Sequence, residues 1–406
     1  MQRRRKPVNV FRIAVLLILV GAALYVNQVV VPTIDPPFVP TATPTRDPES
    51  FVSEARALFD EGKVSQAIAA YEQAVRSNPS DASIYIALAR TQVFAGDFEA
   101  AKTNAENALL LNPNNAMAHA MRAWALNNMG DYLEAESAIT QALELDPNNA
   151  IAHAYYAEIL TNQHFSNQGG LDTLEKAIEE SRLAVSLDPN ALETRRARGY
   201  VLFNTGNYEQ AIAEYEAAIA INRNIADLYI NLGLAYRALG VYNEAITAFT
   251  RANALKPSDP NPDLYTSRTL FTVGDFAKAV QYAEQAVNDA PADAFLRGNL
   301  GVMYYKNLQL NEAAEQLALA LNGGTAPDGT VITPLPLTNS IRITEYYYTY
   351  GLVLMNLNRC VEAVPIFYNI LNTVPNNEIA VYNANFGLEQ CAAKVGTATP
   401  APASTP

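Results

Sequence analysis

The feature that most constrains this 406-residue chain is an internal repeat with a period of 34 residues. Prolines mark the period, because Pro79, Pro113 and Pro147 follow one another at that spacing. Two insertions, of 8 and 16 residues, account for the longer intervals that precede Pro189 and Pro375. A chain of this kind grows by adding units, so it does not need the two or three globular domains that its length alone suggests.

Each unit has the pattern of two helices joined by a turn. In residues 226–257, apolar and small residues recur at spacings of three and four, which is the period of a helix and not of a strand. Gly240 ends the first helix of this unit and Pro257 ends the second. An alanine recurs in phase on the second helix of all nine units, as Ala67, Ala101, Ala135, Ala177, Ala211, Ala245, Ala279, Ala313 and Ala363.

This pattern resembles the tetratricopeptide repeat (TPR), whose 34-residue signature is W-x2-L-G-x2-Y, then A-x3-F, then P. The glycine of the signature is present in four units, as Gly199, Gly233, Gly301 and Gly351. The signature tryptophan is absent, since the single Trp124 is out of phase with it.

The resemblance implies an all-α fold, a right-handed α-solenoid of about nine helix-turn-helix units over residues 48–377. We expect insertions near residues 161–172, which would break the fourth unit after its first helix, and near 322–339. The second insertion contains apolar residues that are unusual in a loop, so it either folds against the solenoid or contacts a partner. Residues 378–395 are expected to form a capping helix, because the last repeat of a solenoid otherwise exposes an apolar face.

The N-terminal residues have the composition of a membrane signal. Residues 1–12 carry five basic and no acidic side chains, and residues 13–31 are apolar apart from Asn27 and Gln28. A helix that spans a bilayer needs ~20 residues, and its basic flank stays in the cytoplasm. We therefore predict a cytoplasmic stub (1–12), a single transmembrane signal anchor (13–31) and a Pro/Thr-rich linker (32–47). The alternative is a signal peptide that is cleaved near Gly21, which would release a secreted protein.

Both readings place the remainder of the chain outside the cytoplasm. That remainder carries 23 basic and 41 acidic residues, and a body so acidic is a poor nucleic-acid binder. Its C-terminal residues 396–406 have a Thr/Pro/Ala composition typical of a disordered tail.

The residues of catalytic and metal sites are scarce. No nucleophile motif, phosphate-binding glycine loop or paired metal-ligand spacing is present, so we expect no enzyme activity, metal or cofactor. His119 and His153 occupy the same position in adjacent repeats, the position that the signature fills with tryptophan. Packing between helices explains them better than a metal or pH-sensing role, although such a role is conceivable.

The TPR resemblance implies that the first helices line a concave groove that binds extended peptides or partner helices. Counting along these helices places aromatic residues, asparagines and dispersed arginines in the groove. The partner-binding residues we predict are Arg196, Tyr200, Asn231, Arg237, Tyr265, Arg268, Asn299 and Tyr305. Aromatic rings provide contact area at low entropic cost and arginine binds carboxylates with two parallel hydrogen bonds. The alternative is that these side chains pack on one another and fill a narrow superhelix.

These residues predict a membrane-anchored, extracytoplasmic scaffold that binds a protein or peptide partner and helps to assemble or organise an envelope complex. The Lys/Asn clamp with which one TPR subgroup binds C-terminal carboxylates is not reproduced here. A carbohydrate-binding envelope module is the main alternative, because Tyr, Trp and Asn also suit sugars. An enzyme with a site in the groove is a weaker one.

The two cysteines are Cys360, at the start of the second helix of the last repeat, and Cys391, at the end of the capping helix. They are equidistant from Pro375, which lies in the turn between these helices, so an antiparallel hairpin would place them opposite each other. We predict a disulfide in an oxidising compartment that stabilises the protein by roughly 3 kcal/mol. The alternative is two small buried apolar side chains.

Overall fold

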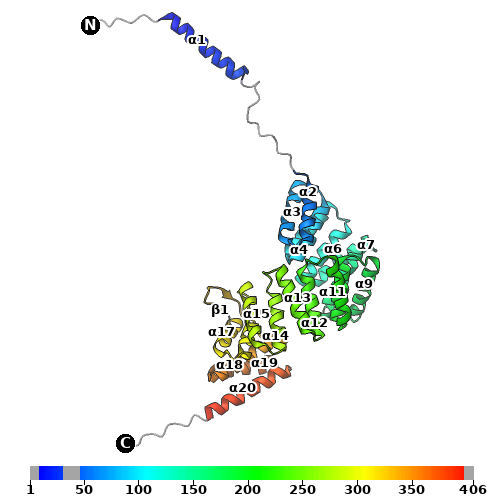
Figure 1. Ribbon diagram of the computed structural model, residues 1–406, viewed down its shortest axis with the longest axis vertical. Helices are drawn as coiled ribbons and strands as arrows, with labels where there is room; N and C mark the ends of the chain where they lie inside the picture. Colours follow the sequence, from blue (N-terminus) through cyan, green and yellow to red (C-terminus); the bar gives the residue numbers. More distant parts are fainter. Residues whose placement is uncertain (1–8, 31–45, 397–406) are drawn as a thin grey trace, which may run out of the picture. The chain divides into compact units, whose positions relative to one another are not determined.

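The computed structural model describes residues 9–30 and 46–396 of the chain (Figure 1). It contains two compact units, Met1–Asp47 and Pro48–Pro406, each of which is described by itself. Most of the predicted cytoplasmic stub, most of the linker and almost all of the predicted C-terminal tail lie outside the described residues.

The described part of the first unit is an exposed apolar helix. It consists of α1 (Val10–Tyr25) followed by one π-helical turn, η1 (Val26–Val30). The segment Val10–Val29 has a mean hydropathy of 2.2 and is long and apolar enough to cross a membrane. The helix begins three residues before the predicted anchor because the side chain of Asn9 accepts a hydrogen bond from the Arg12 N–H and caps its first turn.

The second unit is an all-α solenoid. Within described residues 46–396 the helices form nine successive pairs, and each pair packs on the next (Figure 1). The pairs are α2 (Pro48–Asp60) with α3 (Val64–Ser77), α4 (Ala82–Ala95) with α5 (Phe98–Leu111), α6 (Ala116–Met129) with α7 (Tyr132–Leu145), α8 (Ala150–Phe165) with α9 (Thr173–Leu187), α10 (Leu192–Asn204) with α11 (Tyr208–Ile221), α12 (Ala226–Ala238) with α13 (Tyr242–Leu255), α14 (Asn261–Thr272) with α15 (Phe276–Asp289), α16 (Ala294–Lys306) with α17 (Leu310–Asn322), and α18 (Ile341–Asn356) with α19 (Cys360–Thr373).

Local sequence signals set the helix ends. Asn115 and Asn149 precede first helices, and each side chain accepts a hydrogen bond of 3.0 Å from a backbone N–H of the first turn. Gly96 and Gly130 end first helices in the left-handed conformation, both with φ of 87°, which glycine adopts without steric cost. The 34-residue period of these signals therefore produces a period of paired helices.

Close packing within a pair depends on the signature glycine. A Cβ atom at Gly233 would lie 2.5 Å from the ring of Phe249, and one at Gly351 would lie 2.4 Å from the ring of Phe367. In both repeats the large side chain lies 16 residues after the glycine, on the second helix. The missing side chain on the first helix thus makes room for an aromatic ring that fills the core of the pair.

The first insertion differs from the prediction. It does not interrupt the fourth repeat directly after a helix of normal length, because α8 continues to Phe165 and absorbs part of the insertion. The remaining residues form the connection to α9, which starts at Thr173. The insertion therefore lengthens the first helix of this repeat.

The second insertion folds against the solenoid. It forms a short antiparallel hairpin of β1 (Gly324–Thr325) and β2 (Val331–Ile332). Ile332 is only 2% exposed and packs in a cluster with Ala294 of α16 and with Ala326. The backbone N–H of Leu335 donates to the carbonyl of Ala320 at 2.9 Å, which attaches the hairpin to α17.

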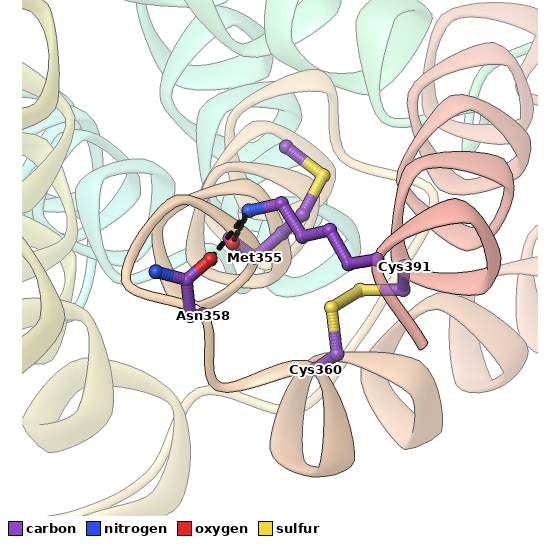
Figure 2. Close-up of a disulfide and its surroundings, with 5 residues drawn as sticks. Met355, Asn358, Cys360 and Cys391 are labelled. Atoms are coloured by element: carbon purple, nitrogen blue, oxygen red, sulfur yellow. Dashed lines mark hydrogen bonds between the residues drawn. A yellow bond between two sulfur atoms is a disulfide. The ribbon is translucent and has the colours of Figure 1, made fainter. Parts of the chain in front are cut away.

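The capping helix α20 (Glu378–Gly396) packs against α18 and α19. Figure 2 shows that Cys360 and Cys391 are joined as a disulfide, with their Cα atoms 5.5 Å apart. The ammonium group of Lys394 donates to the carbonyl of Met355 at 2.7 Å and to the side-chain oxygen of Asn358 at 2.9 Å (Figure 2). The end of the cap is thus attached to the last repeat by one covalent bond and by hydrogen bonds.

Candidate functional site

Aromatic residues on the first helices of the first four repeats form a continuous column. The ring centroids of Phe59 and Phe94 are 5.5 Å apart, and those of Phe94 and Trp124 are 5.0 Å apart. Trp124 then stacks on Tyr155 at 4.5 Å with an interplanar angle of 8°. Trp124 is 1% exposed and Tyr155 is fully buried. These rings are part of the core of the N-terminal half and do not form a surface for a ligand.

Arg196 covers this column and is held by its neighbours. Its guanidinium lies 4.7 Å from the centroid of the Trp124 ring, 2.6 Å from a carboxylate oxygen of Glu158 and 3.6 Å from one of Asp227. Burial raises the pKa of Glu158 to about 7, although the charge of Arg196 opposes the shift. The predicted partner-binding residue Arg196 is therefore already occupied by an internal ion pair.

Contacts between repeats that are distant in sequence close the N-terminal half. Arg90 on α4 pairs with Glu193 on α10, and the side-chain amide of Asn224 donates to the carbonyl of Asp60 at 2.7 Å. Phe59 belongs to a buried cluster that also contains residues of α10 and α12 and of the turn before α12, namely Leu192, Ile225 and Leu228. The first two repeats thus contact the fifth and sixth repeats directly, and we call this set of contacts the N-terminal clasp.

A cavity of ≈ 370 Å³ remains beside the clasp. Its charged side chains are compensated by one another. Arg196 pairs with Asp227 as described, and the ammonium group of Lys256 lies 3.7 Å from a carboxylate oxygen of Asp259 and donates to the carbonyl of Ala95 at 3.1 Å. This cavity therefore presents no unbalanced charge.

Three further predicted residues also have internal partners. The hydroxyl of Tyr200 donates to an asparagine side chain of α8, and the side-chain amide of Asn231 donates to Asp227 at 3.1 Å. Asn299 is 2% exposed, and its side-chain oxygen accepts a hydrogen bond of 3.0 Å from Arg268. The predicted ability of these side chains to pair with a peptide is used, in the free protein, by contacts within the solenoid.

The remaining predicted residues lie around an open cavity of ≈ 240 Å³ in the sixth to ninth repeats. We call its lining the C-terminal groove. The lining comes from the first helices α12, α14, α16 and α18 and the start of α13, and consists of Arg237, Tyr242, Arg268, Phe271, Thr272, Asn299, Met303, Arg342 and Glu345.

Aromatic rings support the cations of the C-terminal groove. The guanidinium of Arg237 lies 5.6 Å from the centroid of the Tyr265 ring. The ammonium group of Lys306, at the edge of the groove, lies 5.8 Å from the centroid of Phe271 and 5.7 Å from that of Tyr305. Such contacts hold a cation in place without neutralising it.

Positive charge dominates the C-terminal groove. Burial, together with the nearby guanidinium groups of Arg268 and Arg342, lowers the pKa of Arg237. Glu345 is the single carboxylate in the lining, and it pairs with Arg342 at 2.9 Å. Among the residues that the structure describes, no carboxylate forms an ion pair with Arg237 or Arg268.

The sequence analysis missed Arg342, Glu345 and Lys306 as members of this site. Arg342 precedes the residue at which the 34-residue period begins the ninth unit, so it was counted as part of the insertion. The structure starts α18 at Ile341, which adds a turn and brings Arg342 into the groove. A helical reading of residues 341–344 would have provided the signal.

The two aligned histidines have a structural role that recurs along the chain. The Nε2 atom of His119 donates to the carbonyl of Pro113 at 3.0 Å, and that of His153 donates to the carbonyl of Pro147 at 2.9 Å. The same contact, six residues back to the end of the preceding repeat, is made at the equivalent positions by Arg195, Tyr229 and Arg297. A hydrogen-bond donor at this position therefore joins consecutive repeats.

Comparison with protein families matches this architecture over most of the solenoid. Models described as TPR repeat or tetratricopeptide repeat match residues 199–240, 58–125, 118–149, 226–259 and 266–329. The chain is a tetratricopeptide repeat protein. TPR solenoids mediate protein–protein interactions, so this TPR protein belongs to that functional class.

Curated relatives share only part of their length with this TPR protein. It is 30% identical over 145 residues to protein O-mannosyl-transferase TMTC3 of Homo sapiens, covering 34% of this chain and 16% of that protein. It is 24% identical over 161 residues to anaphase-promoting complex subunit 3 of Schizosaccharomyces pombe, covering 40% and 24% respectively. It is 26% identical over 203 residues to BBSome complex member BBS4 of Bos taurus, covering 48% and 38%. The chain thus spans well under half the length of these relatives.

Solved structures show the same kind of fold. Yeast Tom70 covers 87% of this TPR protein and 97% of its own chain, with a TM-score of 0.43 and 15% identity. A tetratricopeptide repeat protein from Parabacteroides merdae covers 67% and 98% respectively, with a TM-score of 0.46 and 15% identity.

Proposed function

We propose that the protein is a membrane-anchored, extracytoplasmic TPR scaffold that binds a protein or peptide partner in the C-terminal groove. One observation carries the proposal. Four successive first helices surround an open cavity with cations that no carboxylate neutralises, whereas the corresponding surface of the N-terminal half is filled by its own aromatic column. Unoccupied donors in a concave TPR surface are the features that a partner would use.

The membrane part of the proposal rests on α1 and its surroundings in the sequence. The exposed apolar helix is consistent with a signal sequence or an anchor, and the basic residues before it favour a cytoplasmic N-terminus. N-terminal sequencing of the protein from membranes tests this part. An intact Met1 supports an anchor, whereas a mature start near Leu24 contradicts it and indicates secretion.

We further propose that the scaffold organises a complex in the cell envelope. Two of the relatives, anaphase-promoting complex subunit 3 and BBSome complex member BBS4, are named as members of complexes. The envelope location is an inference from α1 alone. We propose no enzymatic activity, because the C-terminal groove combines cations and aromatic rings without a nucleophile and base pair.

Site-specific photo-crosslinking of the full chain in its native membrane tests the partner-binding site. A photo-reactive amino acid replaces Phe271 or Tyr305 at the C-terminal groove, and, as a matched control, Tyr368 on α19, whose ring is 54% exposed outside the groove. We expect the two groove positions to give the same protein adduct and the α19 position to give none.

Two results contradict the proposal. The first is the absence of a protein adduct at both groove positions when the variants are folded, as judged by circular dichroism. The second is an adduct of equal yield at Tyr368, which would indicate contact that is not specific to the groove. Adducts that contain glycan and no protein would favour a carbohydrate-binding module instead.

A further inference from the structure

We propose that the C-terminal groove selects an acidic, extended peptide segment, whose carboxylates pair with Arg237, Arg268 and Arg342. This inference rests on the proposed function and specifies the chemistry of the partner. It depends on the position, support and charge balance of these three arginines.

Arg268 is held in place by neutral partners. Its Nε atom donates to the side-chain oxygen of Asn299 at 3.0 Å and its Nη2 atom donates to the hydroxyl of Tyr346 at 3.1 Å. The guanidinium also lies 5.0 Å from the centroid of the Phe295 ring. These contacts fix the orientation of the group but leave its full positive charge available, which lowers the entropic cost of binding an anion.

Arg237 is supported in the same way. It lies over the face of Tyr265 and is partly buried. Two further guanidinium groups lie near it, so in the free protein the three like charges repel one another. A bound carboxylate would remove this repulsion and would form charge-assisted hydrogen bonds, which are about twice as strong as neutral ones.

The contrast with the cavity beside the N-terminal clasp shows that this charge is local. There, Arg196 and Lys256 each face an aspartate, and the charges cancel. The chain as a whole has a formal net charge of −13. At physiological salt the Debye length is about 8 Å, so the distant acidic surface is largely screened, whereas ion pairs at contact distance inside the groove are not.

The size of the cavity favours part of a long ligand. Its volume of ≈ 240 Å³ is below the ~300–1,000 Å³ that is typical of pockets that enclose small molecules. It suits one or two acidic side chains of a segment that continues along the neighbouring first helices. The aromatic rings of Phe271 and Tyr305 beside it suit the apolar residues of such a segment.

The lining favours a peptide over a sulfated glycan. Glu345 lies among the arginines and is an acceptor, so it suits a backbone N–H and repels a uniform polyanion. A peptide with spaced acidic residues supplies both a donor for Glu345 and acceptors for the arginines. A sulfated polysaccharide supplies acceptors almost alone.

Fluorescence anisotropy of the full chain in detergent micelles tests this assignment. The probe is a dye-labelled ten-residue peptide that alternates glutamate and glycine, and the comparison peptide replaces each glutamate with glutamine. We expect the glutamate peptide to bind at least about tenfold more tightly, because each charged hydrogen bond contributes roughly 1.5–3 kcal/mol. The affinity should fall as the salt concentration rises.

Matched variants identify the site. Arg237→Ala should weaken binding of the glutamate peptide about tenfold or more, whereas Arg251→Ala should change it less than about twofold. Arg251 is an exposed arginine of α13 whose guanidinium lies over Tyr229, outside the groove. The thermal unfolding of both variants checks that they fold.

Equal binding of the glutamate and glutamine peptides would overturn the assignment. So would an equal loss of affinity in Arg237→Ala and Arg251→Ala. Binding of heparin that depends on Arg237, without binding of the glutamate peptide, would reassign the groove to an anionic glycan. A protein adduct in the crosslinking experiment without binding of the glutamate peptide would contradict this inference and leave the proposed function standing. Binding of the glutamate peptide without a protein adduct would do the reverse.

Discussion

Single residues decide how closely the two helices of a repeat approach. Gly199, Gly233, Gly301 and Gly351 each face a larger side chain of the second helix, which is Tyr215, Phe249, Leu317 and Phe367 respectively. In the second repeat, by contrast, Ala89 replaces the glycine and the residue 16 positions later is the small Ala105. Small and large residues thus compensate each other within a repeat, and this relation is visible in the sequence once the period is known.

Gly233→Ala tests this compensation. The added methyl group would lie 2.5 Å from the Phe249 ring, so we expect a loss of about 1–3 kcal/mol of unfolding free energy in urea denaturation. Phe249→Ala is also expected to destabilise the protein, by about 3–5 kcal/mol. The double variant should be more stable than the sum of the two changes predicts by at least about 1 kcal/mol. Strict additivity would show that the two positions do not interact.

Glu158→Gln should change how stability depends on pH. The pKa of Glu158 is about 7 in the folded protein, against an ordinary value of 4.5. The folded state therefore retains a proton that the unfolded chain releases between these values. The stability that Glu158 contributes is full below about pH 4.5 and is lost as the pH rises through about 7.

Urea denaturation between about pH 4.5 and 8 measures this effect. The unfolding free energy of the wild type relative to Glu158→Gln should fall with rising pH, by at most about 3 kcal/mol. Glu99→Gln, which removes an exposed carboxylate on α5, controls for the loss of one negative charge. A wild-type advantage that increases with pH would show that Arg196 and Trp124 stabilise the carboxylate more than burial destabilises it.

Whole elements explain how the solenoid ends. The capping helix α20 packs over the last repeat, and a Cβ atom at Gly387 would lie 2.1 Å from the ring of Phe367. The same ring also contacts the first helix of its repeat at Gly351. Phe367 is thus enclosed between two helices, and the disulfide joins the far end of the cap to α19.

The disulfide makes a prediction for this element. It closes a segment with a sequence separation of 31 residues, so in the chain-entropy model Cys360→Ser together with Cys391→Ser should lower the unfolding free energy by about 3–4 kcal/mol. Reductant should destabilise the wild type and leave the double variant unchanged. A thiol assay on the denatured, unreduced wild type should find no free thiol. Two reactive thiols would show that the cysteines are reduced in the protein.

At the scale of the whole solenoid, contacts beyond nearest neighbours distinguish the two halves. A repeat array normally gains stability only from contacts between adjacent repeats. The N-terminal clasp adds contacts between the first two repeats and the fifth and sixth, through Asn224 with Asp60 and Arg90 with Glu193. We therefore expect the first six repeats to unfold more cooperatively than the last three.

Phe59→Ala tests the clasp. Loss of the ring should raise hydrogen exchange in α2 and also in α12, about 165 residues away in sequence, because Phe59 packs in one cluster with Ile225 and Leu228. Hydrogen exchange with mass spectrometry measures both segments. Leu110→Ala, at a side chain that is 82% exposed, is the control and should change neither. Faster exchange in α2 and its neighbours α3 and α4 alone would show that the clasp contributes no stability.

The sequence by itself determined the repeat and its helices. Period, caps and breakers are local signals, and they recur often enough for the 34-residue unit, the nine helix pairs and the capping helix to be predicted. The approach of Cys360 to Cys391 also followed from local arithmetic, because the two helices are consecutive. The hairpin in the second insertion was not predicted, since its two-residue strands are too short for a periodic pattern.

The tertiary structure decided which side chains of the inner face are available. Tyr155 and Tyr305, or Arg196 and Arg237, have the same residue type and similar positions in their repeats, and the sequence does not separate them. Arg196 is neutralised by Glu158 on a neighbouring first helix, whereas Arg237 meets only other arginines and an aromatic ring. The physical reason is that electrostatic balance and burial depend on residues brought together from several repeats. The curvature that brings them together is a sum of small packing differences, which no single repeat specifies.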